Sequence, residues 1–119
     1  MLKFFSSLFI LILPHLIYSQ KIVPIDSVST YLGQHVKICD KIADAFRPAG
    51  ESSITYLNFG GKYPDHVFTV VIFAKDLSNF SYVPSEHLKN KNVCVQGIIN
   101  EYKGKPQIVA KFPDQIEVQ

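Results

Sequence analysis

The sequence predicts a small all-β barrel of five strands with a short helix on its N-terminal side. Segments rich in valine, isoleucine and phenylalanine recur along the chain, and loops containing glycine, proline and serine separate them. Only one stretch, between the third and fourth strands, breaks this rhythm with helix-like residues. A chain of 119 residues is long enough for one domain, which excludes a multidomain enzyme.

The first nineteen residues have the layout of a secretory signal peptide. Lys3 gives a basic start, residues 4–16 are almost entirely apolar, and Ser19 is a small residue at the end. The apolar stretch is too short for a stable membrane span. We therefore expect residues 1–19 to be a signal peptide and residues 20–119 to be an exported domain, periplasmic or secreted. A signal that stays uncleaved as an anchor is the alternative.

Composition limits the classes of function. The whole chain carries a formal net charge of +2, and removing the predicted signal peptide lowers it to +1. That value excludes a strongly basic nucleic-acid-binding protein, whose affinity depends on many phosphate contacts. The hydrophobic fraction excludes a disordered tail.

Capping residues and apolar periodicity predict where the helix and the strands lie. Asp26 or Ser27 can cap the first helix, and Gly33 ends it. The strands are expected at residues 36–43, 54–59, 67–73, 92–100 and 107–112, followed by a short extended piece at 116–118. The residues expected to face inward are Val36, Ile38, Ile42, Leu57, Phe59, Phe68, Val70 and Ile72, and Phe73 and Phe112 are also expected in the core.

The connections follow from turn chemistry. Residues 47–53 and 60–65 form loops, and Gly104 lies at the turn of the last hairpin. Between the third and fourth strands, residues 76–80 can form one helical turn, and Pro84 should end any longer helix. Five strands with a short helical or irregular link after the third are in the order of an OB-fold barrel.

Two cysteines in an exported domain favour one disulfide, which would close a loop of about 55 residues. In an OB barrel the first and fourth strands are antiparallel neighbours, so Cys39 and Cys94 can lie on the same face of adjacent strands. Two buried thiols and a redox-active pair are the alternatives. A metal site formed with His35, four residues before Cys39 on the same strand face, is a further one.

Five stretches carry a resemblance to known proteins. They are residues 33–39 (GQHVKIC), 55–64 (TYLNFGGKYP), 68–73 (FTVVIF), 93–99 (VCVQGII) and 102–108 (YKGKPQI). Together they resemble a group of small exported bacterial OB-fold domains of poorly defined function, which are usually labelled nucleic-acid-binding because of their fold. The resemblance covers most of residues 31–117 and implies the fold more strongly than any activity. The sequence departs from the pattern at Asp40, where glycine is more usual, as at Gly97.

The residues favour binding over catalysis. His35, His66 and His87 form no helical metal-binding pair, and no G-x-S-x-G motif is present. Residues 85–87 (Ser-Glu-His) are consecutive, so their side chains point apart. Nucleases built on OB barrels use several arginines, and Arg47 is the only arginine here. We therefore expect no catalytic residue, no cofactor and no metal.

OB barrels bind ligands over the second and third strands, between the first loop and the last hairpin. Single-stranded nucleic acid requires aromatic platforms and cations along such a groove. The residues expected to bind ligand are Arg47, Tyr56, Asn58, Lys62, Tyr102, Lys103 and Lys105. Each has a structural alternative, because tyrosine also packs on barrel surfaces and lysine also solubilises turns.

The function expected from these observations is a non-catalytic exported OB-fold module that binds single-stranded nucleic acid or another anionic oligomer. The alternative is a module of the cell envelope that binds a small ligand, a glycan or a protein partner.

Overall fold

A computed structural model describes residues 21–119, so the predicted signal peptide lies outside the described residues. The elements are η1 (Ile25–Tyr31), β1 (His35–Phe46), β2 (Thr55–Phe59), β3 (Phe68–Ile72), η2 (Ala74–Asn79), α1 (Pro84–His87), β4 (Asn92–Tyr102), β5 (Lys105–Val109), η3 (Pro113–Gln115) and β6 (Ile116–Val118), where η marks a 3-10 helix. No helix within residues 21–119 has the length and apolar character needed to cross a membrane.

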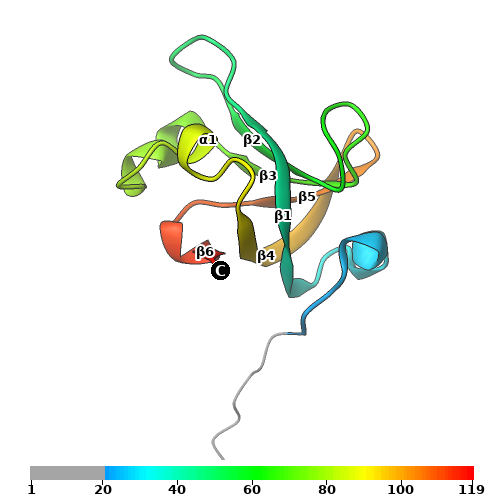
Figure 1. Ribbon diagram of the computed structural model, residues 1–119. Helices are drawn as coiled ribbons and strands as arrows, with labels where there is room; N and C mark the ends of the chain where they lie inside the picture. The colour runs from blue at the N-terminus through cyan, green and yellow to red at the C-terminus, as the bar shows by residue number, and fades with distance from the viewer. Residues whose placement is uncertain (1–20) are drawn as a thin grey trace, which may run out of the picture.

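The strands close into a barrel (Figure 1). Their order is β1-β2-β3-β5-β4-β6, and β1 also pairs with β4, which closes five strands on themselves and leaves β6 against the first half of β4. All pairs are antiparallel except β3 with β5. This arrangement is the five-stranded barrel of the OB fold, as the sequence predicts.

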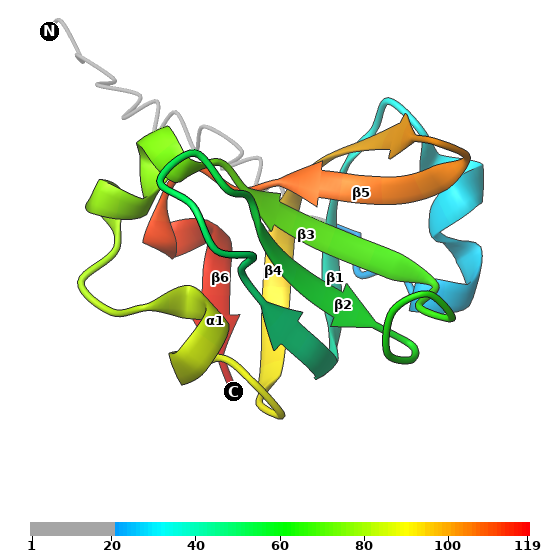
Figure 2. The ribbon, with the colours of Figure 1, turned by 90° about the horizontal axis from the view of Figure 1, so that it is seen from above.

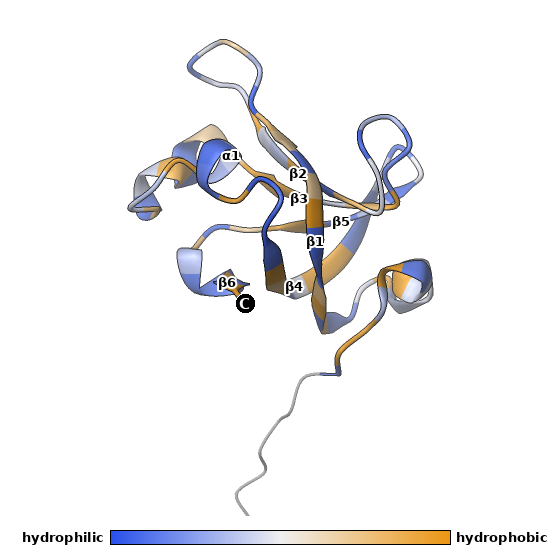
Figure 3. Ribbon diagram, viewed as in Figure 1, coloured by the Kyte–Doolittle hydropathy of each residue, from blue (hydrophilic) through white to orange (hydrophobic). Residues whose placement is uncertain are grey.

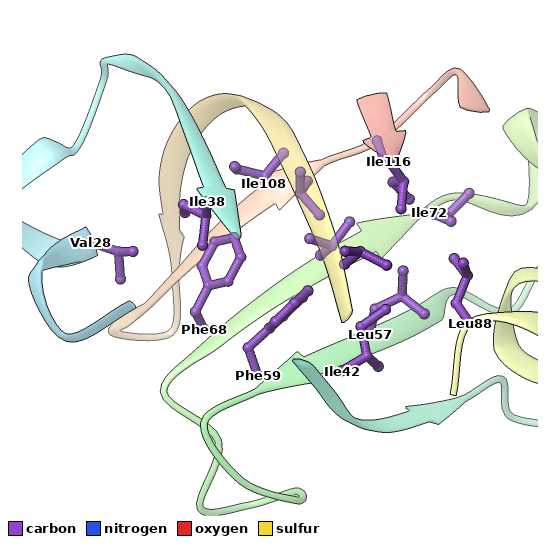
Figure 4. Close-up of a cluster of buried hydrophobic side chains, with 14 of the residues drawn as sticks. Val28, Ile38, Ile42, Leu57, Phe59, Phe68, Ile72, Leu88, Ile108 and Ile116 are labelled. Carbon is purple, nitrogen blue, oxygen red and sulfur yellow. The ribbon is translucent and has the colours of Figure 1, made fainter. Parts of the chain in front are cut away.

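The barrel interior is filled by apolar side chains from every strand (Figure 4). The eight residues predicted to face inward are at most 1% exposed, which confirms that prediction. Figures 1 and 2 place η1 and α1 at opposite ends of the barrel. Val28 of η1 is buried at one end, and Leu88 directly after α1 is buried at the other. Fully burying such a side chain contributes about 1.5–3 kcal/mol.

Two predictions about the core are wrong. Phe73 is 36% exposed and Phe112 is 55% exposed, because each follows the end of a strand and no longer obeys its alternation. The helical segment η2 ends at Asn79, before Pro84, and Pro84 itself occupies the first turn of α1. Proline suits that position because the first turn of a helix needs no donor from it.

A bulge in β1 changes which residues face outward. The pairing of β1 with β2 shifts between Ile42 and Asp44. As a result, Ile42 faces inward before the bulge and Ala45, three residues later, is the next side chain to face inward. Without that extra residue Phe46 would point into the barrel, because strand side chains alternate with a period of two. Asp40, by contrast, keeps a regular pairing with Val93.

Cys39 and Cys94 form a disulfide across β1 and β4, as predicted. The two residues are direct cross-strand partners, with Cα atoms 4.0 Å apart. Both lie on the outer face, since Ile38 and Val95 beside them point into the barrel. Because the two sulfurs are bonded to each other, the alternatives of two free thiols and of a metal site built on them do not apply.

Candidate ligand-binding groove

An open groove of about 600 Å³ crosses the outer face of β2, β3 and β5. Its floor comes from the outward residues Tyr56, Asn58, Thr69 and Gln107. Its walls come from three connections: Phe46 and Pro48 where β1 leads into its loop, Tyr63, Pro64 and His66 in the β2–β3 loop, and Tyr102, Lys103 and Lys105 around the β4–β5 hairpin. The loops that frame the groove are mostly hydrophilic, while apolar residues alternate along the strands beneath them (Figure 3).

Aromatic rings form a continuous set along one side of this groove. The Phe46 ring stacks on the Tyr56 ring with centroids 5.2 Å apart, and it meets the Tyr63 ring edge-on at 6.3 Å. Tyr63 in turn stacks on His66 at 5.9 Å. Tyr63 is 67% exposed and Tyr102 is 61% exposed, so both side chains are largely accessible to a ligand.

The groove floor contains a buried amide with an unused acceptor. Asn58 is 1% exposed and donates from Nδ2 to the Asp44 carboxylate at 3.5 Å, which also accepts from the Tyr63 backbone N–H. Its Oδ1 has no hydrogen-bond partner among residues 21–119, and the nearby Thr69 hydroxyl donates to the Leu57 carbonyl instead. An unpaired buried acceptor is costly in the free protein.

Lys105 connects the β4–β5 hairpin to the β2–β3 loop through hydrogen bonds. Its ammonium donates to the Pro64 carbonyl at 2.5 Å and to the His66 carbonyl at 3.2 Å. Burial lowers the pKa of His66 from its ordinary 6.5, and the charge of Lys105 lowers it further, against weaker opposing effects of Asp44 and Asp65. His66 is therefore a neutral ring at neutral pH, and the groove carries little free charge.

The structure brings together five of the seven residues predicted to bind ligand, namely Tyr56, Asn58, Tyr102, Lys103 and Lys105. It does not bring in Lys62, which is exposed beside the groove. Arg47 is also outside it, because strand alternation turns Arg47 away from the face that Phe46 occupies. Its guanidinium bonds to carbonyls of its own loop and lines a separate hollow.

Seven further residues line the groove that were not among those expected to bind ligand: Phe46, Pro48, Tyr63, Pro64, His66, Thr69 and Gln107. Gln107 could have been found, because it alternates with the inward Ile108. Phe46 could not, since its outward direction depends on the bulge in β1. His66 could not either, because its place depends on how the β2–β3 loop folds back toward Lys105.

Comparisons with known proteins support the fold. No family model matches the sequence, and no curated protein matches it. A solved chain described as an aspartyl-tRNA synthetase from Leishmania major Friedlin matches with a TM-score of 0.50 and 14% identity, over 90% of this chain and 22% of that chain. The chain thus spans about a fifth of that synthetase.

Two further solved structures are similar at a lower score. The structure of "OBody AM1L10 bound to hen egg-white lysozyme" gives a TM-score of 0.49 at 16% identity, over 87% of this chain and 97% of that chain. An aspartyl tRNA synthetase from Entamoeba histolytica gives 0.49 at 13% identity, over 91% of this chain and 23% of that chain. At these identities the similarity concerns the fold alone.

Proposed function

We propose that the protein is a non-catalytic, exported OB-fold module whose groove binds short single-stranded nucleic acid mainly by base stacking. The observation that carries this proposal is the set of aromatic rings along the groove, in which Tyr63 and Tyr102 are largely exposed. Stacking of a base on such a ring contributes about 1–3 kcal/mol and tolerates any base.

The available cations argue for few phosphate contacts. Lys105 is held by two carbonyls, and Arg47 faces away from the groove. Lys103 is therefore the groove cation that can contact a phosphate. Its ammonium lies 5.5 Å from the Tyr102 ring centroid. One or two phosphate contacts to a single strand predict that affinity falls only about three- to sevenfold between about 50 and 200 mM salt.

The test is fluorescence anisotropy of a labelled single-stranded oligonucleotide titrated with the purified protein. We expect Tyr102→Ala and Tyr63→Ala each to weaken binding at least about fivefold, because each removes one stacking platform. Tyr102→Phe should bind like the wild type. Phe112→Ala is the control, since Phe112 is similarly exposed but does not line the groove.

The scarcity of free cations also favours a second candidate, a neutral glycan stacked on the same rings. Sugar rings lie against aromatic faces and hydrogen-bond to amides such as those of Asn58 and Gln107. Absence of oligonucleotide binding at both salt concentrations would contradict the nucleic-acid proposal. Binding of neutral oligosaccharides that is lost in Tyr63→Ala and insensitive to salt would support the second candidate.

A further inference from the structure

A second hollow lies at the end of the barrel, between the β1–β2 loop and the segment that joins η2 to α1. Its volume is about 350 Å³, which suits a small molecule. Leu77, Phe80 and Pro84 provide apolar walls, and Tyr82 adds a second ring that meets the Phe80 ring edge-on at 5.7 Å. Polar side chains of Thr55, Arg47 and Ser81 also line this hollow.

The first polar group is the hydroxyl of Thr55. Thr55 is 0% exposed, and none of the described residues offers its Oγ1 a hydrogen bond. Thr69 shows the usual arrangement, since its hydroxyl donates to the Leu57 carbonyl at 3.2 Å. A valine at position 55 would fill nearly the same volume without burying an unpaired hydroxyl, so threonine is costly here unless a group from outside the chain, a water or a ligand, meets its hydroxyl.

The second polar group is the Arg47 guanidinium at the rim. Nε donates to the Ser53 carbonyl at 3.4 Å, and Nη2 donates to the carbonyls of Gly50 and Glu51 at 3.4 and 3.1 Å. These bonds fix the side chain but supply no negative charge. Within the part of the chain that the structure describes, no hydrogen bond engages Nη1 and no carboxylate pairs with Arg47.

We propose that this hollow binds a small carboxylate with an aromatic or branched apolar body. The carboxylate would accept hydrogen bonds from the free guanidinium nitrogen of Arg47 and from the Thr55 hydroxyl. The apolar body would lie against Leu77, Phe80 and Pro84. An unneutralised cation, an unpaired hydroxyl and apolar walls in one concave site are the features that such a ligand satisfies together. This site is separate from the groove, so the proposal does not depend on the function proposed there.

The test uses benzoate as the probe and benzamide, which has the same ring without the charge, as its control. Binding is followed by amide chemical shifts of the purified protein. We expect benzoate to bind in the millimolar range, with shifts centred on Arg47, Thr55 and Tyr82, and benzamide to bind about tenfold or more weakly. Equal binding of the two probes, or no shifts at these residues, would overturn the proposal.

Thr55→Val separates ligand binding from a purely structural role. We expect this variant to bind benzoate at least about fivefold more weakly while its thermal midpoint rises by about 4 °C, because an unpaired buried hydroxyl has been removed. Thr69→Val is the matched control for stability, and its midpoint should fall because a made hydrogen bond is lost. If Thr55→Val binds benzoate as the wild type does, the assignment is wrong. Arg47→Gln should weaken benzoate binding and leave benzamide unaffected.

Discussion

Gly97 lies on β4 at a point where the barrel has no room for a side chain. A Cβ built there would come within 2.6 Å of the branch methyl Cγ2 of Ile108, which is fully buried and rotationally stiff. We expect Gly97→Ala to lower the free energy of unfolding by about 1–3 kcal/mol, measured by urea denaturation.

The same position allows a specific control at the residue scale. Ile108→Leu removes the branch methyl that the new Cβ would meet, so the double variant should be less destabilised than the sum of the two single variants. Strict additivity would show that the cost of Gly97→Ala comes from backbone effects and that the contact with Ile108 is unimportant.

At the scale of elements, the β2–β3 loop and the β4–β5 hairpin are joined by Lys105. We expect Lys105→Met to raise the pKa of His66, because one of the two causes that lower it is removed. Burial would continue to lower the pKa of His66, while Asp44 and Asp65 would continue to raise it. The measurement is an NMR titration of the His66 ring, with faster exchange of the loop amides as a second readout.

Lys103→Met is the matched control, because it removes the same charge from the same hairpin without a bond to the loop. It should leave the pKa of His66 unchanged, and an equal rise in both variants would contradict a specific role of Lys105. The lowered pKa also has a consequence for stability. As pH falls below 6.5, the unfolded chain binds more protons at His66 than the folded chain does, because the folded pKa is lower. The contribution of His66 to the free energy of unfolding is therefore complete above pH 6.5 and is lost as pH falls below that value.

At the scale of the whole molecule, the Cys39–Cys94 bond crosses the pair β1–β4, the pair that closes the barrel. With a sequence separation of 55, the chain-entropy model gives the crosslink about 4 kcal/mol. We expect reduction to lower the urea midpoint substantially while the folded barrel persists, because its core and ladders do not include the sulfurs. Unfolding of the reduced protein without denaturant would contradict this expectation, and a Cys39→Ser/Cys94→Ser variant that ignores the reductant is the control.

The amino-acid sequence was enough to predict the fold class, the order of the elements along the chain and the inward residues of β2 and β3, and it favoured a Cys39–Cys94 disulfide over the alternatives. These properties follow from period-two alternation and turn chemistry, which are local and therefore readable along the chain. Tyr56 and Asn58 were placed on the outer face by the same alternation, and the structure puts both in the groove.

Only the tertiary structure decided which other side chains reach the groove and which are free to bind. The β1 bulge turns Phe46 outward and sends Arg47 to the second hollow, and nothing in the spacing of apolar residues signals that bulge. Lys105 donates hydrogen bonds to carbonyls about forty residues away in sequence, so its ammonium is held against the β2–β3 loop although its position was predicted. Loop directions and hydrogen-bond partners depend on contacts between distant segments, and such contacts exist only once the barrel has closed.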